Sequence, residues 1–303
     1  MTAPAPYTVF GVGSVGTVLA GCLASRGIPT AVMGRGAVAS IRMEGDDENT
    51  EAHVRVVDSP EGIILLCVHD SQVAEVCARW PERTVVTFSN GVSAEETAAR
   101  WCRVIGGVWR MTCTLQSPGH ALFTRRGRIV LGAWPRGTSG DVESIAGDLR
   151  QAGFSVAVSP AIGEDIWLKL LCNIGSTANA LVPPADHTDS RFGAIKAALT
   201  EEAWDAMRRH GIVARSCDGK DASPEEEIRR QSITGARVRP VYNDTWRQLS
   251  LGRRPQERYH RIIVDLDGSA TLNARMAELL DRATRPECYS INELARALHW
   301  SSR

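Results

Sequence analysis

Short apolar runs alternate with helical segments through the first half of the chain. Runs rich in β-branched residues predict strands at 7–12, 28–34, 52–58, 62–68 and 84–90. Helical periodicity predicts helices at 14–27 and 71–80. This alternation of strand and helix is typical of a parallel sheet covered on both faces, which also explains why the predicted strands are almost continuously apolar.

The pattern changes after Pro160. Before it, further strands are predicted at 102–109, 110–115, 127–132 and 154–159, with a helix at 140–153. After it, strand patterns nearly vanish and helical periodicity predicts helices at 163–181, 194–210, 224–234, 241–250, 255–266 and 272–282. The sequence therefore predicts an α/β domain at 1–160 and an all-helical domain at 161–303.

Composition and charge exclude several classes of protein. Lys+Arg and Asp+Glu are 35 each, so no global field favours nucleic acid or an anionic membrane. The longest clean apolar run, 63–68, is too short to cross a bilayer, and the chain opens without a signal-peptide pattern. The eight cysteines are scattered and show no metal-ligand spacing. We expect a reduced, cytoplasmic protein without a metal.

Two local basic clusters, at 123–128 and 250–258, are candidate anion sites. A solvated surface is the better interpretation of the first cluster.

The segment "GVGSVG" matches the pattern G-x-G-x-x-G through Gly11, Gly13 and Gly16, directly after a predicted strand and at the start of a predicted helix. In dinucleotide-binding folds these glycines allow a tight turn, close approach of the backbone to the pyrophosphate, and close packing of helix on strand. The helix N-terminus then presents free N–H groups to the phosphates. The sequence predicts a dinucleotide site here.

The second strand ends "VMGRG", without the carboxylate that would bind the ribose 2′-hydroxyl of NAD. Arg35 stands where a guanidinium could bind the 2′-phosphate of NADP. This favours NADPH over NADH. The alternative is that Arg35 is an ordinary surface arginine at a strand end.

Lys169 lies among apolar residues in "EDIWLKLLCN", just after the domain boundary. In a continuous helix Lys169, Asn173 and Thr177 would share one face, because they recur every four residues. A lysine, an amide and a hydroxyl along one wall could bind and protonate a carbonyl. The alternative is a lysine that extends its ammonium to water past an apolar stem.

Taken together, the motifs resemble the ketopantoate reductase (2-dehydropantoate 2-reductase) family over most of the chain. The matching segments, in order, are "GVGSVG", "VMGRG", "FSNGV", the strands of 106–132 with their Pro-Gly turn, "IWLKLLCN" and "TWRQLSLGRRPQE". The resemblance implies a Rossmann-type domain followed by a helical domain like the C-terminal domain of 6-phosphogluconate dehydrogenase, with the active site between them. It is also compatible with a homodimer.

The resemblance assigns a role to each matching residue. Lys169 would be the general acid that protonates the ketone oxygen as hydride arrives, which suits a developing alkoxide. Asn90 would bridge cofactor and substrate, and Glu257 would lie at the same cleft; the alternatives are a turn asparagine before glycine and a helix-surface carboxylate. The implied substrate ligands are Asn173, Thr177 and Thr245. The implied cofactor contacts are Gly11, Gly13, Ser14, Val15, Gly16, Arg35, His69, Asn90 and the backbone near Leu115.

The chain departs from the family pattern at three places. His69 replaces a lysine expected to help hold the 2′-phosphate, and Thr177 replaces a second substrate-contacting asparagine. The family's E-[IV]-D-x-x-N-G run reads "ERYHRII" at 257–263, without the Asp and Asn. A site with an altered polar lining discriminates against the original substrate, so we expect a related but distinct carbonyl compound.

Three functions remain open from the sequence. The first is an NADPH-dependent reductase acting on a 2-oxo acid or related ketone. The second is a reductase of an imine or other carbonyl in a specialised pathway, using the same lysine. The third is a non-catalytic dinucleotide-binding sensor. Retention of Lys169, Asn90, Asn173 and Glu257 together speaks against the third.

Overall fold

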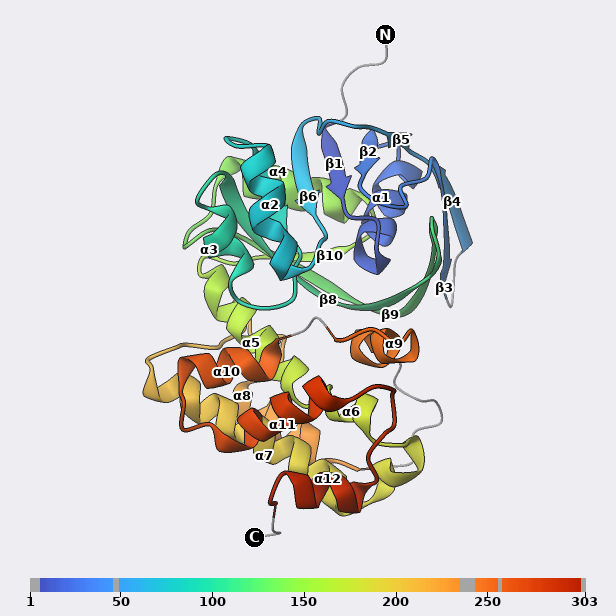
Figure 1. Ribbon diagram of the computed structural model, residues 1–303. Helices are drawn as coiled ribbons and strands as arrows, with labels where there is room; N and C mark the ends of the chain where they lie inside the picture. Colours follow the sequence, from blue (N-terminus) through green and yellow to red (C-terminus); the bar gives the residue numbers. More distant parts are fainter. Residues whose placement is uncertain (1–5, 46–48, 235–242, 256–257, 301–303) are drawn as a thin grey trace. The chain divides into compact units, whose positions relative to one another are not determined.

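The structure is a computed structural model that describes residues 6–45, 49–234, 243–255 and 258–300, with the backbone alone at 124–126. The chain divides into two compact units, Met1–Asp165 and Ile166–Arg303 (Figure 1).

The N-terminal unit is built on one ten-stranded sheet. Its strands are β1 (Tyr7–Phe10), β2 (Thr30–Met33), β3 (Ser40–Gly45), β4 (Asn49–His53), β5 (Arg55–Val56), β6 (Ile63–Leu66), β7 (Thr84–Thr87), β8 (Arg103–Ser117), β9 (His120–Ala133) and β10 (Ser155–Val158). Its helices are α1 (Ser14–Ser25), η1 (Asp70–Gln72), α2 (Val73–Arg79), α3 (Ala94–Ala98) and α4 (Gly140–Gln151).

The strand order is β4-β3-β9-β8-β7-β6-β1-β2-β5, with β10 beside β9. From β5 through β2, β1, β6 and β7 to β8, all neighbours pair in parallel, as the sequence predicts. The prediction of a wholly parallel sheet is wrong beyond β8, because β8 and β9 form an antiparallel hairpin and β3 pairs antiparallel with β4. The sheet is therefore mixed. The predicted strands at 102–109 and 110–115 are one long strand, since β9 continues to pair with β8 on both sides of Arg110.

Helix α1 is enclosed by the curved part of this sheet (Figure 1). It packs against β1 and β2 and also against β3, β4, β8 and β9, which curve around it. Two glycines make this enclosure sterically feasible. A Cβ at Gly16 would lie 1.9 Å from the carbonyl oxygen of Gly11, and one at Gly21 would lie 2.7 Å from Sδ of Met43. The helix is consequently buried from Gly16 to Gly21 and again at Leu23.

Helices α2 and α3 cover the other face of the central strands. Their buried side chains pack with those of β6 and β7 in one apolar cluster formed by Ile64, Leu66, Val73, Val76, Cys77, Val85, Ala94 and Ala98. The opposite faces of the same strands belong to the larger cluster around α1 and α4. Burial on both faces explains why the strands read as continuous apolar runs.

The C-terminal unit is all-helical over its described residues, as predicted. Its helices are α5 (Ile162–Ile174), α6 (Ala178–Leu181), η2 (Pro184–Thr188), α7 (Ser190–Arg209), α8 (Pro224–Ser232), α9 (Asp244–Ser250), α10 (Tyr259–Leu266), α11 (Thr271–Arg282) and α12 (Ile291–Ala297). The boundary between the two units falls within α5. The long helix α7 packs against α8, α10, α11 and α12 and so forms the centre of this unit.

The predicted single helix at 163–181 is interrupted after Ile174. Gly175 permits a close approach, because a Cβ there would lie 2.5 Å from Oε1 of Gln231. The carbonyl of Ser176 accepts a hydrogen bond of 2.6 Å from Nδ2 of Asn243, beside the backbone hydrogen bond of 3.2 Å from Asn179. Lys169 and Asn173 still lie four residues apart on α5, but Thr177 lies in the break and does not continue their face.

The packing of α1 predicts opposite outcomes for two Gly→Ala substitutions in helices. We expect Gly16→Ala to destabilise the fold by about 1–3 kcal/mol or more, since its methyl group would collide with backbone. The methyl group of Gly147→Ala on α4 would have no atom within 4 Å. This substitution should stabilise the fold by about 0.5–1 kcal/mol, because alanine has the higher helix propensity. Urea unfolding of both variants measures the two changes, and equal effects would contradict the enclosure of α1.

Candidate functional site

The glycine-rich turn lies where β1, β2 and β6 end. Gly11 has a φ of +93° and donates its N–H to the carbonyl of Met33 at 3.0 Å. A Cβ at Gly11 would lie 2.6 Å from the carbonyl oxygen of Cys67. Strands β2 and β5 lie on one side of β1, and β6, β7 and β8 lie on the other. The turn thus lies at the topological switch point, where open α/β sheets bind their ligands.

The residues after this turn fit a bound pyrophosphate. Gly13 is exposed, and a Cβ built on it would meet no atom within 4 Å. It is the N-cap of α1, no side chain caps the helix, and the first turn contains no acidic residue. The first N–H groups of α1 are therefore available to an anion, and the helix dipole favours negative charge there.

Further predicted cofactor contacts, Ser14 with Leu115 and Arg35, lie beside this turn. The hydroxyl oxygen of Ser14 accepts a 3.0 Å hydrogen bond from the backbone N–H of Leu115 on β8. Arg35 is exposed between Gly34 and Gly36, both of which have a positive φ. A Cβ at Gly34 would lie only 3.5 Å from the backbone nitrogen of Gly11. Arg35 therefore follows directly on a residue that lies at the glycine turn.

His69 and Asn90 follow the adjacent strands β6 and β7, and both side chains are exposed. The hydroxyl of Ser89 donates to the carbonyl of Val68 at 2.8 Å and so joins the two loops. Gly91, with a φ of +121°, turns the chain after Asn90. The structure thus brings the glycine turn, Arg35, His69, Asn90 and Leu115 to one edge of the N-terminal unit.

In the helical unit, Lys169 and Asn173 are partly buried on α5. Thr245, in the first turn of α9, is 4% exposed. The N-cap of α9, Asn243, donates to the carbonyl of Ser176, and the hydroxyl of Ser176 donates to the carbonyl of Asn173 at 2.6 Å. The start of α9 is thereby tied to the end of α5. Glu257 lies outside the described residues.

Thr177 is completely buried, and a polar network within the helical unit occupies its hydroxyl. Its Oγ1 lies 2.6 Å from Nε2 of His260, whose Nδ1 lies 2.7 Å from Oδ1 of Asn273. The amide of Asn273 donates to the carboxylate of Glu202 at 2.8 Å and to the carbonyl of Leu199. These donors leave Oδ1 of Asn273 to accept, which assigns the neutral Nδ1–H tautomer to His260. The network argues against direct contact of Thr177 with a substrate.

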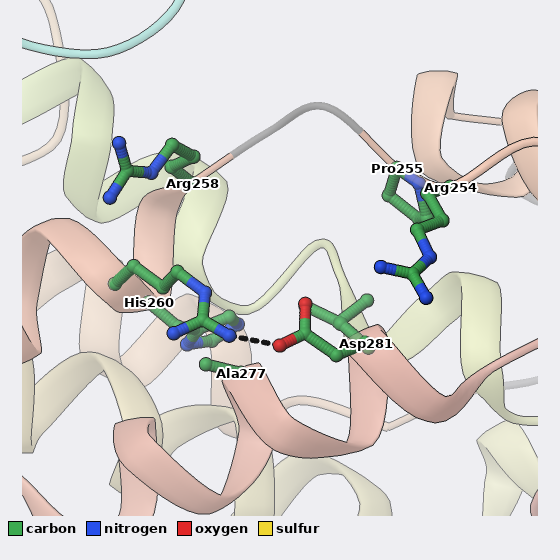
Figure 2. A pocket seen from close by; sticks show the side chains of 8 residues that line it. Arg254, Pro255, Arg258, His260, Ala277 and Asp281 are labelled. Atoms are coloured by element: carbon green, nitrogen blue, oxygen red, sulfur yellow. Dashed lines mark hydrogen bonds and ion pairs between the residues drawn. The ribbon is translucent and has the colours of Figure 1, made fainter.

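A small hollow of about 60 Å³ lies beside the start of α10, next to the second basic cluster at 250–258 (Figure 2). Three arginines line it, Arg254, Arg258 and Arg261, and the last of these pairs with Asp281. Figure 2 shows Arg254 and Arg258 on opposite sides of the hollow. An anion site in this cluster remains a prediction.

A larger cavity of about 340 Å³ lies in the N-terminal unit at the last turn of α1. Cys22, Arg26, Met43 and Phe154 are among its lining residues. None of the residues predicted for the site from the sequence lines it. Its place at the end of α1, opposite the glycine turn, separates it from the candidate cofactor site.

Sequence reasoning missed three buried or bridging polar residues, Glu95, Asn243 and His260. Asn243 could have been found, because an asparagine before "DTWRQL" is an N-cap signal. Glu95 and His260 carry no such signal. Each makes its contacts with residues on other elements, and a titratable residue in a helical pattern is ordinarily exposed.

The strand order, the glycine turn at the switch point and the uncapped helix after it define a Rossmann-type dinucleotide-binding domain. Residues 7–136 match the family model described as ketopantoate reductase PanE/ApbA. The match covers most of the N-terminal unit, and it agrees with the resemblance seen in the sequence.

Relatives and solved structures agree with this assignment. The 2-dehydropantoate 2-reductase of Archaeoglobus fulgidus is 27% identical over 175 residues, which cover 54% of this chain and 60% of that protein. The match therefore spans less than two thirds of the relative's length. A PanE/ApbA family ketopantoate reductase from Ralstonia eutropha JMP134 has a TM-score of 0.76 at 18% identity, covering 92% of this chain and 98% of the other. D-mandelate dehydrogenase in complex with NADH has a TM-score of 0.73 at 15% identity, covering 92% and 97%. At such identities the likenesses show the fold, and they confirm the predicted fold class.

Within the described parts of the chain, no helix combines the length and the apolar character needed to cross a bilayer. The same residues contain no group of three or more His, Cys, Asp or Glu side chains that could hold a metal ion.

The buried His260 predicts a pH-dependent stability. Burial lowers the pKa of His260 from 6.5 to about 4, so the folded chain binds this proton less readily than the unfolded chain. The contribution of neutral His260 to the free energy of unfolding should therefore be fully present above about pH 6.5. It should be lost as the pH decreases through 4, by about 3 kcal/mol in total. Urea unfolding between pH 7 and 4 measures this slope.

In His260→Gln this part of the slope should disappear. The matched control is His53→Gln on β4, where the side chain is exposed, and it should retain the slope of the wild type. A slope that His260→Gln leaves unchanged would show that other groups cause the acid sensitivity.

Proposed function

We propose that this protein is an NADPH-dependent oxidoreductase of the ketopantoate reductase type that transfers hydride to the carbonyl of a 2-oxo acid or related ketone. The observation that carries the proposal is the set of predicted cofactor contacts at one edge of the sheet, around an uncapped helix N-terminus. The relatives named 2-dehydropantoate 2-reductase support carbonyl reduction. The NADH complex of D-mandelate dehydrogenase supports a nicotinamide dinucleotide as the cofactor.

The cofactor would be held by the turn at Gly11, Gly13 and Gly16, with Arg35 and His69 nearest its phosphates. When bound, it supplies the hydride. Arg35 offers a planar, permanently charged guanidinium, which suits a 2′-phosphate, and no carboxylate follows β2 to select the free ribose. His69 can add a hydrogen bond where the family pattern has a lysine. These residues support NADPH over NADH.

Lys169 is proposed as the general acid. An ammonium group can both stabilise the negative charge that develops on the carbonyl oxygen and donate the proton that completes the alcohol. Its partial burial on α5, between the buried Leu168 and Leu170, limits its exposure to water. Asn90 would orient the carbonyl toward the nicotinamide, and Asn173 and Thr245 would bind the rest of the substrate. Glu257 is proposed for the same site.

The substrate is proposed to differ from ketopantoate. Thr177 is buried against His260, which argues against the substrate contact that the family pattern assigns to an asparagine at this position. The polar residues of the family's E-[IV]-D-x-x-N-G run are also replaced, at Tyr259 and Ile262. A related ketone, or an imine that Lys169 could equally protonate, fits these changes. The homodimer and the cytoplasmic location expected from the sequence remain predictions.

The general-acid role predicts that Lys169→Ala lowers turnover by roughly 10²–10⁴ on any accepted substrate. The assay follows NADPH oxidation with ketopantoate, then with a panel of 2-oxo acids and cyclic imines. Lys220→Ala, at an exposed lysine of the same unit, is the control and should be as fast as the wild type. Full activity of Lys169→Ala would remove the proton-donor role. Turnover of no panel member would favour the dinucleotide-binding sensor.

The cofactor assignment predicts different effects at Arg35 and Gly13. Arg35→Ala should weaken NADPH binding by roughly ten- to a hundredfold, the loss of one charge-assisted phosphate contact, and should leave NADH binding nearly unchanged. Gly13→Ala should weaken both cofactors, because its methyl group would enter open space that the pyrophosphate needs. Nicotinamide fluorescence titration measures the affinities, with Arg100→Ala as an exposed control. Equal loss of both cofactors in Arg35→Ala would refute 2′-phosphate recognition.

A further inference from the structure

Glu95 is a buried carboxyl group that the proposed reaction does not use. It lies in the first turn of α3, directly behind the loop 89–93 that carries Asn90, and it is 2% exposed. The hydroxyl of Thr87, the last residue of β7, lies 2.6 Å from its Oε1. Its Oε2 has no hydrogen-bond partner among the described residues. An ionised carboxylate whose hydrogen-bond partners are all neutral would be costly in this apolar setting.

A second carboxylate lies under the neighbouring loop. Asp70 follows His69 at the start of η1, and the hydroxyl of Ser93 donates to its Oδ2. Asp70 is the charged group, among the described residues, whose field acts on Glu95. The neighbours of Glu95 on α3, Ala94 and Ala98, pack in the apolar cluster with side chains of α2, β6 and β7. The two loops with the predicted cofactor contacts are thus anchored through Asp70 and Glu95.

The neutral form of Glu95 fits this position better than the ionised form. Burial is the largest influence on Glu95 and outweighs the hydrogen bonds from Thr87 and from the backbone of Glu95, which lower its pKa. With a smaller contribution from the charge of Asp70, the pKa of Glu95 is raised from 4.5 to about 7. A neutral Glu95 can donate its proton to Thr87, whose hydroxyl then points to the carbonyl of Ile105 at 3.4 Å. Ionisation breaks this chain of donors and places two negative charges beneath the loops.

We infer that Glu95 is a positioning residue whose neutral carboxyl holds the loop 89–93, and with it Asn90, in the geometry that binds the nicotinamide end of the cofactor. The inference rests on the proposed function and adds to it a control by pH. Since the folded protein holds this proton up to about pH 7, cofactor affinity is retained below that pH and is lost as the pH rises through it.

The test compares NADPH affinity in the wild type and in Glu95→Gln from pH 5.5 to 8.5 by fluorescence titration. Glutamine keeps the shape and a donor for Thr87 but cannot ionise. The quantity measured is the ratio of the two dissociation constants at each pH, because it cancels every pH-dependent contribution to binding that the two proteins share. We expect the wild type to lose at least threefold in affinity relative to Glu95→Gln, with a midpoint near pH 7.

Two further variants sharpen the result. Asp70→Asn removes the neighbouring charge and should move the midpoint of the affinity loss to lower pH than in the wild type. If Glu95→Gln does not fold, this shift tests the inference by itself. Glu96→Gln, at the adjacent exposed carboxylate of α3, should behave as the wild type. Parallel profiles of wild type and Glu95→Gln, or an unmoved midpoint in Asp70→Asn, would overturn the inference while leaving the proposed function intact. No binding by the wild type at any pH would overturn the proposed function and this inference together.

Discussion

The approach of α1 to β1 is the constraint on which the N-terminal unit depends. With no side chain at Gly16, the helix comes so close to Gly11 that a single Cβ would lie within 1.9 Å of its carbonyl oxygen. This contact directs the N-terminus of α1 to the edge where β2, β6 and β7 also end. It also places α1 deep enough for β3, β4, β8 and β9 to pack around it. One missing methyl group thus sets both the core and the position of the candidate cofactor site.

Local sequence was sufficient for the features that arise within a few residues. The β1–α1–β2 unit and its glycines could be predicted because turn, helix start and strand are consecutive. The break after Ile174 could not, because its causes lie far along the chain, in Gln231 against Gly175 and in Asn243 on the carbonyl of Ser176. The same holds for the mixed sheet, since the length of β8 is set by its pairing with β9 and not by its own pattern.

The residues of the candidate site also fall into those that local sequence could predict and those that depend on distant contacts. Arg35, His69 and Asn90 each follow a strand directly, so their common edge could be anticipated from strand order in a parallel sheet. Thr177 was placed on the face of Lys169 by extending a helical period across the break, and the structure gives it a buried partner, His260, instead. A period of 3.6 residues carries information only as far as the helix continues.

Two buried titratable groups, one in each unit, share one physical solution, which is neutrality. His260 is held neutral by burial, with Asn273 accepting from its ring, and Glu95 is held neutral up to about pH 7 by burial and by Asp70. Hydrogen bonds at fixed positions can then be kept without the cost of an unpaired buried charge. Each group stands directly behind a segment that carries proposed site residues, Glu95 behind the Asn90 loop and His260 behind the end of α5. The chain therefore places titratable groups, Glu95 and His260, in the layer that supports the segments with proposed site residues.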